Sequence, residues 1–326
     1  MTVKRNKLII GSRGSKLALW QANWVKEKLE NLYPELKIEI EKIKTTGDKI
    51  LDAPLAKIGG KGLFVKEIEE ALLSGRVDLA VHSMKDVPTE IPEGLHISAI
   101  CEREDPKDAF ISIDGKSLRE LERGAIVGTS SLRRTVQLKA LRDDLSIVSL
   151  RGNVDTRLRK LKEGKFHAIV LAMAGLKRMG FEHMVTELLS EDLMIPAIGQ
   201  GAIGIETRID DDFVNELLKP LNHEETAICV LAERAFLSVV GGGCQVPLAC
   251  HAKIIYGNGA SLVKISGMIG DPEGKIPIIK GFREGSISQA QRLGAELARE
   301  LLERGGNRIV EKVYSVERLD FLKTLL

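Results

Sequence analysis

The sequence has almost no surplus charge and no long apolar run. It has 48 Lys and Arg residues and 46 Asp and Glu residues, with a formal net charge of +2. This balance gives no overall attraction to nucleic acid or to an anionic membrane, so an anionic ligand would need cations concentrated locally. No apolar segment is long enough to cross a bilayer, and the stretch at residues 8–10 is too short for a secretion signal. We expect a cytoplasmic protein without a nucleic-acid or membrane partner.

Cysteine is also scarce. The chain has 4 cysteines, Cys101, Cys229, Cys244 and Cys250, and they form no C-x-x-C pair and no Cys/His spacing typical of zinc. Three of them are interpreted as reduced thiols of a cytosolic protein. Cys244 differs because it lies in the glycine-rich turn at residues 241–247. An accessible thiol suits covalent chemistry, although a glycine-rich hinge with an incidental cysteine is the alternative.

The length of 326 residues predicts two or three domains. Up to about Arg208, strand patterns alternate with helical periodicity, which predicts parallel or mixed sheets covered by helices. The expected strands are 8–12, 37–44, 77–81, 109–113, 125–128, 146–150, 168–172 and 201–206, and the expected helices are 17–32, 64–73, 132–142, 154–162 and 176–179.

The character of the chain changes from Asn222 onward. A long amphipathic helix is expected at 224–240, followed by strands at 248–256, 261–269 and 276–282 and a final helix at 288–304. A three-stranded sheet with helices against it indicates a separate small α+β domain.

The junctions between predicted strands and helices are rich in hydroxyl groups and cations. They lie at residues 12–15, 82–86, 128–134 and 151–157. Helix N-termini bind anions through unpaired N–H groups, and arginine adds a planar fork that matches a carboxylate. Junctions at the carboxyl ends of strands line a common crevice, so we expect an anion site there. The alternative is that Ser and Thr only cap helices and that the arginines are solvated.

Two further features suggest roles in such a site. The segment from Thr45 to Phe64 ends in a run, residues 57–64, that carries three glycines and two lysines just before a helix. We interpret it as a lid in which Lys57 and Lys61 contact carboxylates, although an ordinary flexible connection is the alternative. Asp86 follows Lys85 among the cations; it is either a salt-bridge partner of that lysine or a carboxylate that stabilises a ligand cation.

Taken together, motifs along nearly the whole chain resemble the porphobilinogen deaminase (hydroxymethylbilane synthase) family. They are RGSKLALWQ at 13–21, GGKGLF at 59–64, AVHSMKDVP at 80–88, REDP at 103–106, GTSSLRR at 128–134, LRGN at 150–153, PAIGQG at 196–201 and GGCQVP at 242–247.

The resemblance implies a three-domain α/β fold. Domains 1 and 2 would be α/β lobes like those of periplasmic binding proteins, and domain 3 would be the small α+β domain with a three-stranded sheet. The implied boundaries are 1–101 with 202–219, then 107–196, then 223–326. A monomer is expected from the family.

The resemblance also implies the activity. The enzyme, a transferase, would condense four porphobilinogen molecules head to tail with release of ammonia and give the linear tetrapyrrole hydroxymethylbilane. The primer would be a dipyrromethane cofactor attached to Cys244 by a thioether. Each pyrrole ring carries an acetate and a propionate, so the growing chain is a polyanion that needs many cationic contacts.

By the same resemblance, residues at the matching positions receive roles. The cofactor would be bound by Cys244, Ser83, Lys85, Thr129, Ser131, Arg133, Arg134 and Arg151. The substrate would be bound by Arg13, Ser15, Gln21, Lys57, Lys61, Phe64, Arg157, Arg178 and Gln200.

Asp86 would be the catalytic residue. Its carboxylate would stabilise the cation left by loss of ammonia and handle protons. Asp155 departs from a cation-rich loop, and we expect it to turn away from the site and cap the helix. Two further departures, the three glycines before Cys244 and Ala249 beyond Pro247, remove no reacting atom and put only the local loop geometry in doubt.

Two rival functions use the same features. A binding module, such as a solute receptor or the effector domain of a regulator, would also have two α/β lobes, but it would need no thiol at Cys244. A phosphate-handling transferase would use the same helix termini, but the sequence has no G-x-x-x-x-G-K-[ST] loop and no carboxylate cluster for magnesium.

Overall fold

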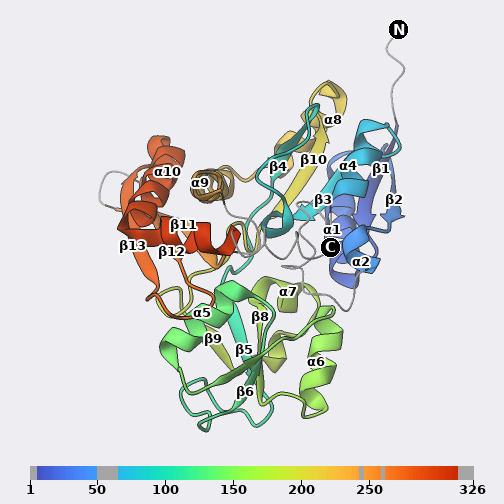
Figure 1. The fold of residues 1–326 in the computed structure, drawn as a ribbon. Helices are drawn as coiled ribbons and strands as arrows, with labels where there is room; N and C mark the ends of the chain where they lie inside the picture. Colours follow the sequence, from blue (N-terminus) through green and yellow to red (C-terminus); the bar gives the residue numbers. More distant parts are fainter. Residues whose placement is uncertain (1–5, 50–64, 242–245, 258–260, 315–326) are drawn as a thin grey trace, which may run out of the picture. The chain divides into compact units, whose positions relative to one another are not determined.

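The computed structural model describes residues 6–49, 65–241, 246–257 and 261–314 (Figure 1). These residues form two compact units. The first unit contains the described parts of 6–104 together with 201–227, and the second contains 105–200 and the described parts of 228–314. No helix within the described ranges is both long and apolar enough to span a bilayer.

The first unit is built on a mixed five-stranded sheet of order β2-β1-β3-β10-β4. Strand β1 (Lys7–Arg13) pairs in parallel with β2 (Lys37–Ile43) and β3 (Leu79–Ser83). Strand β10 (Ile203–Arg208) runs antiparallel to β3 and to β4 (Leu95–Ile100). The chain thus leaves this unit after β4 and returns at β10, which places two distant segments in one sheet.

Three helices cover this sheet. Helix α1 (Lys16–Leu32) and α8 (Asp212–Leu218) pack on one face, where Leu79 and Val81 of β3 point. Helix α4 (Lys66–Leu73) packs on the other face, against Ala80 of β3. This division follows from the alternation of side chains along a strand. A short helix, α2 (Thr46–Lys49), precedes the undescribed residues 50–64.

The second unit contains two sheets. The first has the order β7-β6-β8-β5-β9, with β5 and β9 antiparallel to their neighbours. Helix α5 packs on one face, and helices α6 and α7 pack on the other. The elements are β5 (Asp108–Ser112), β6 (Ile126–Gly128), α5 (Leu132–Leu141), β7 (Ser146–Val148), α6 (Val154–Lys162), β8 (Ala168–Ala172), α7 (Met173–Arg178) and β9 (Glu187–Leu189).

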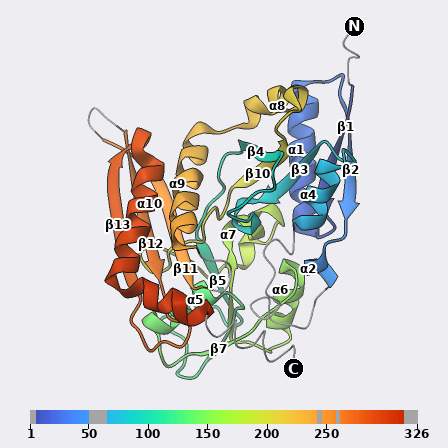
Figure 2. The same ribbon diagram turned by 45° about the horizontal axis from the view of Figure 1, so that its top comes forward.

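The second sheet of this unit is antiparallel and three-stranded, with β11 (Leu248–Tyr256), β12 (Ser261–Ile269) and β13 (Ile279–Ser286). Helix α9 (Glu224–Val240) and α10 (Ala290–Leu301) pack on it (Figure 2). Phe236 and Leu297, both fully buried, belong to the core between them. A π-helical turn at Leu302–Gly306 follows α10.

The predicted fold class is confirmed: two α/β sheets are followed by a small α+β region with a three-stranded sheet. Helices α6 and α9 and strands β8, β11 and β12 have the predicted bounds. The sequence missed β4 and β9. The predicted β13 begins three residues and ends four residues too early, and the predicted β3 and β10 lie two residues too early. The division into three domains remains a prediction.

Candidate functional site

Five of the predicted site residues line one pocket of about 50 Å³ within the first unit. They are Arg13, Ser15, Gln21, Ser83 and Asp86. Two predicted strand-to-helix junctions therefore meet in space, as their place at the ends of parallel strands requires. The pocket combines one guanidinium, two hydroxyl groups, an amide and one carboxylate.

Local structure explains how these side chains are held. Arg13 is the last residue of β1, and the Ser15 hydroxyl caps α1 by accepting a hydrogen bond from the Ala18 amide at 3.2 Å. Gln21, only 2% exposed, donates from Nε2 to the Ser83 hydroxyl at 2.8 Å. This hydrogen bond joins α1 to the end of β3. The capping role proposed for the serine is thus correct for Ser15, and it leaves the residue on the pocket wall.

Asp86 is carried by a 3-10 turn, Met84–Asp86, that follows β3 directly. The Met84 amide donates to the Ala202 carbonyl at 3.0 Å, and the Met84 side chain is buried. Gly204 on β10 leaves the space that this side chain occupies, since a Cβ atom there would overlap the Met84 sulfur. The hydrogen bond to Ala202 and the packing of Met84 against Gly204 therefore fix the turn, and they hold Asp86 at the pocket.

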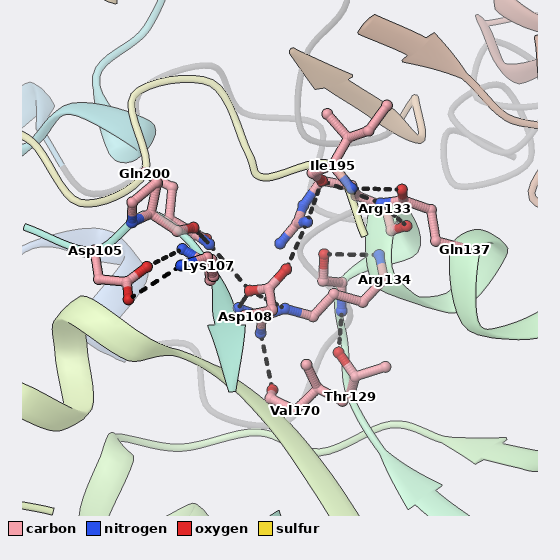
Figure 3. Close-up of polar contacts among 12 residues, drawn as sticks. Asp105, Lys107, Asp108, Thr129, Arg133, Arg134, Gln137, Val170, Ile195 and Gln200 are labelled. Carbon is pink, nitrogen blue, oxygen red and sulfur yellow. Dashed lines mark hydrogen bonds and ion pairs between the residues drawn. The ribbon is translucent and has the colours of Figure 1, made fainter. Parts of the chain in front are cut away.

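The second unit contains a buried cluster of an acid and two arginines (Figure 3). Asp108, which is 0% exposed, accepts from Arg133 Nη1 at 2.7 Å and from Arg134 Nη2 at 2.7 Å and Nε at 3.1 Å. Burial alone would raise the pKa of Asp108, but the charges and hydrogen bonds of Arg133 and Arg134 outweigh it and hold this pKa below its usual range. The cluster therefore keeps one positive charge in excess.

Further contacts complete this cluster. Arg134 Nη1 donates to the Val170 carbonyl at 2.9 Å, and Arg133 Nη1 donates to the Ile195 carbonyl at 2.7 Å. Among the described residues, the Nε and Nη2 groups of Arg133 have no hydrogen-bond partner. One edge of this guanidinium thus remains able to donate to a ligand carboxylate.

Gln200 joins the same cluster. Its Nε2 donates to the Pro106 carbonyl at 2.6 Å and to Asp108 Oδ1 at 3.0 Å (Figure 3). The amide of its neighbour Gly199 donates to Glu233 Oε2 of α9 at 2.7 Å. The segment before β10 is therefore tied both to the arginine cluster and to the helix that leads toward residue 244.

The remaining predicted residues of the second unit lie at helix ends. Ser131 caps α5, and the Thr129 hydroxyl accepts from the Ser131 amide at 3.2 Å. Arg157, in the first turns of α6, donates from Nε to the Gly152 carbonyl at 2.7 Å. Arg151 precedes that helix and Arg178 ends α7; both are partly buried.

Four predicted site residues, Lys57, Lys61, Phe64 and Cys244, lie outside the described residues. Lys85 is exposed on the turn that carries Asp86. Asp155 was expected to cap α6, but the cap residue is Asn153, and Asp155 accepts from the adjacent Thr156 amide at 3.0 Å within the first turn. No group of metal-ligating side chains occurs in the described part of the chain.

Sequence reasoning missed Asp108. It begins β5 and stands directly before the apolar run that predicts this strand. An acid in that position is the available signal, but its partners Arg133 and Arg134 are 25 and 26 residues away in the sequence.

Comparison with known proteins agrees with the motifs. The family model "Porphobilinogen deaminase, dipyromethane cofactor binding domain" matches residues 8–216, and "Porphobilinogen deaminase, C-terminal domain" matches 227–303. Porphobilinogen deaminase of Geobacter sulfurreducens is 54% identical over 96% of this chain and 96% of its own length. That of Trichlorobacter lovleyi is 56% identical over 95% and 98%.

Among solved structures, a TRAP periplasmic solute binding protein from Desulfovibrio salexigens aligns with a TM-score of 0.42 and 13% identity, covering 68% of this chain and 74% of that one. This score is low, and the two α/β sheets are established by their strand pairing alone. The two family models and the two relatives cover nearly the full length, and the chain belongs to the porphobilinogen deaminase family.

Proposed function

We propose that this protein is a hydroxymethylbilane synthase. It condenses four porphobilinogen molecules head to tail, releases ammonia at each step and yields the linear tetrapyrrole hydroxymethylbilane. The observation that carries the proposal is the match to porphobilinogen deaminases over nearly the whole chain at more than half identity. The pocket beside Asp86 and the cationic cluster around Arg133 support it, because the substrate is a dicarboxylate with a basic amine.

The described residues fit a dipyrromethane cofactor. Two linked pyrrole rings carry four carboxylates, and Arg133 has unused donors while its cluster keeps a net positive charge. Arg133, Arg134, Ser131, Thr129, Arg151, Ser83 and Lys85 would hold it, with Cys244 as the covalent anchor. When bound, the cofactor supplies the primer on which the chain is built. Neutralising its carboxylates is the task of these cations, because a buried unpaired charge is strongly unfavourable.

Asp86 is assigned the catalytic role. Loss of ammonia from porphobilinogen leaves positive charge on the substrate, and a fixed carboxylate stabilises that charge. The same carboxylate accepts hydrogen bonds from a pyrrole N–H group and takes up protons. Arg13 and Ser15 bind the substrate carboxylates, as do the remaining predicted cations, Lys57, Lys61, Arg157 and Arg178. Gln21, Phe64 and Gln200 line the cleft in which the substrate lies.

Intact-mass measurement tests the anchor. We expect the purified protein to exceed the 35.8 kDa polypeptide by one dipyrromethane and to react with Ehrlich's reagent. The variant Cys244→Ser should fold, lack the added mass and show little turnover. Cys229→Ala is the matched control, because Cys229 lies on α9, is only 6% exposed in the core and should not affect the added mass. A bare polypeptide mass in the wild type would instead favour a two-lobed binding module.

The variant Asp86→Asn tests the catalytic assignment. It should retain the cofactor yet lose turnover by about 100-fold or more, because the amide neither carries the charge nor accepts the proton. Glu90→Gln, at a nearby exposed acid, is the control. Near-normal turnover of Asp86→Asn would overturn the assignment. We further propose that the protein is cytoplasmic, has three domains and is a monomer. Elution near 36 kDa in gel filtration checks the monomer.

A further inference from the structure

Three ionisable side chains belong to elements that pack together at one face of the first sheet, the face covered by α4. His82 lies on β3, Glu206 on β10 and Glu69 on α4. In the antiparallel register, Glu206 pairs with Ala80 and His82 pairs with Gly204, so His82 and Glu206 are diagonal neighbours on the same face. His82 Nε2 lies 2.9 Å from Glu206 Oε2. Because a carboxylate only accepts, Nε2 is the protonated nitrogen in this pair.

The second oxygen of Glu206 presents a problem. Glu206 is 2% exposed, and its Oε1 is buried without a hydrogen-bond partner within the described residues. A buried acceptor without a donor is unfavourable, and a carboxylate oxygen more so. Nearly every buried polar atom in a folded protein has a partner. A hydrogen atom on a neighbouring acid, which heavy-atom positions do not show, would satisfy this oxygen.

Glu69 is a buried acid on the helix that covers this face of the sheet, and the charge of Glu206 acts on it. It is 9% exposed although it carries a carboxyl group. Burial and then the nearby charge of Glu206 raise the pKa of Glu69 to about 7, against the opposing effect of His82, with a further small increase from Glu70. A protonated carboxyl group has an O–H donor, whereas an ionised one has none.

We propose that Glu69 donates the proton of its carboxyl group to the unpaired oxygen of Glu206, so that Glu69, Glu206 and His82 form a buried hydrogen-bonded chain that positions the active-site turn. His82 is followed at once by Ser83 and the turn that carries Asp86, and it lines the same pocket. Its imidazole is held by Glu206, and Glu206 is held by Glu69. These three are positioning residues, because the contacts of this segment with substrate or cofactor are assigned to Ser83, Lys85 and Asp86.

The proposal fixes the sign of a pH effect. In the unfolded chain Glu69 ionises near pH 4.5, whereas in the folded protein it ionises near 7. Between these values the folded state holds the extra proton, so stability falls as pH rises through this window and stays low above it. At higher pH the chain loses its donor hydrogen and gains a buried negative charge next to Glu206.

The variant Glu69→Gln separates this account from simple packing. The amide donates to Glu206 Oε1 at every pH and never ionises. We expect the thermal midpoint of Glu69→Gln, relative to the wild type, to rise between pH 5 and pH 8. Glu70→Gln, at the exposed neighbour on the same helix, should show no such change. A difference between wild type and Glu69→Gln that is independent of pH would overturn the proposal.

Direct titration provides a second measurement that does not depend on activity. The ¹³C-carboxyl resonance of Glu69, assigned by its absence in Glu69→Gln, should titrate near pH 7 in the holoenzyme. Glu206→Gln removes the adjacent negative charge and offers an amide donor to Glu69, so the midpoint should move toward 4.5. A midpoint near 4.5 in the wild type would refute the hydrogen-bonded chain even if Glu206→Gln fails to fold.

The effect on turnover rests on the proposed function. The ratio of kcat at pH 8.5 to kcat at pH 7 should be higher in Glu69→Gln than in the wild type, with KM for porphobilinogen little changed. If the ratios are equal while the titration and stability results hold, the chain is structural and does not position Asp86, which sinks that part of the proposal. If no variant acts on porphobilinogen at any pH, the proposed function fails, and titration still decides the hydrogen-bonded chain.

Discussion

Two buried acids in this protein have opposite surroundings. Asp108 in the second unit is enclosed by the guanidinium groups of Arg133 and Arg134, and its pKa lies below the usual range despite complete burial. Glu69 in the first unit is also buried, but its neighbours are another carboxylate and one imidazole, and its pKa is raised to about 7. Burial favours the neutral acid at both places, so the charge of the neighbours decides the outcome.

The contrast corresponds to two tasks. A carboxylate that stays ionised can hold two arginines in a fixed geometry while leaving part of their charge for an anionic ligand. A carboxyl group that stays protonated can instead serve as a donor to a second acid. The protonation state of a buried acid therefore depends on its partners. The following substitutions test whether the partners alone account for the difference in pKa between Asp108 and Glu69.

The largest effect is expected from Asp108→Asn. The substitution keeps the shape but leaves two buried guanidinium groups without a counter-charge, and we expect a loss of about 3–5 kcal/mol in unfolding free energy. Urea denaturation measures it. The control is Asp114→Asn, at an exposed ion pair with Lys116, which should leave the denaturation midpoint nearly unchanged. A small loss for Asp108→Asn would mean that water or rearrangement compensates the arginines, and the contrast with Glu69 would lose its basis.

A smaller loss of unfolding free energy is expected from Arg134→Lys, which keeps the positive charge but removes the planar guanidinium group. Arg134 reaches Asp108 Oδ1 with both Nε and Nη2 and the Val170 carbonyl with Nη1. Lysine cannot reproduce that geometry, and we expect a loss of about 1–3 kcal/mol. If stability in urea does not change, charge alone holds Asp108, and geometry adds nothing.

The smallest effect concerns Glu191, a partly exposed acid that also contacts an imidazole. His251 Nε2 lies 3.3 Å from Glu191 Oε1, and Lys253 Nζ lies 2.6 Å from Oε2. The hydrogen bond from His251, and then the Lys253 contact, outweigh burial and lower the pKa of Glu191 to about 2. Its contribution is therefore present above pH 4.5 and is lost as pH falls toward 2.

For Glu191→Gln we expect a loss of about 1 kcal/mol at pH 6, reduced because the group is a quarter exposed to solvent. The loss should shrink by pH 3, as followed by urea denaturation at both pH values. The same loss at both would show that the imidazole contact does not depend on the charge of the acid. In that case the pKa difference between Glu191 and Glu69 would need another cause.

Much of the fold could be predicted from the sequence, for identifiable reasons. The bounds of α9, β11 and β12 are correct because each is a long run rich in apolar residues that ends at turn-forming residues, such as the Gly-Asn-Gly at 257–259 between the two strands. Strand β9 has only three residues, too few to show a period. The early prediction of β3 arose because residues 77 and 78 are buried but lie outside the strand pairing.

The site was predicted unevenly, and the unevenness has a physical cause. The convergence of Arg13, Ser83 and Asp86 on one pocket could be predicted, because junctions at the carboxyl ends of parallel strands lie at the same edge of a sheet. The buried acids could not. In the sequence, Glu69 looks like an ordinary charged residue of a helix, and Glu206 is the last residue of a predicted strand. Their burial results from packing between segments more than 100 residues apart. Long-range partners, which set the pKa values, leave no local signal.

Gly204 has no side chain, and this restricts which residues the sequence can accept at that position. A methyl group there would collide with the sulfur of Met84, whose residue starts the turn bearing Asp86. A library randomised at codon 204 and selected for turnover should return glycine almost alone, although nothing at that position touches a reactant. The position of the Asp86 carboxylate would then depend on the absence of a side chain at one residue of the neighbouring strand.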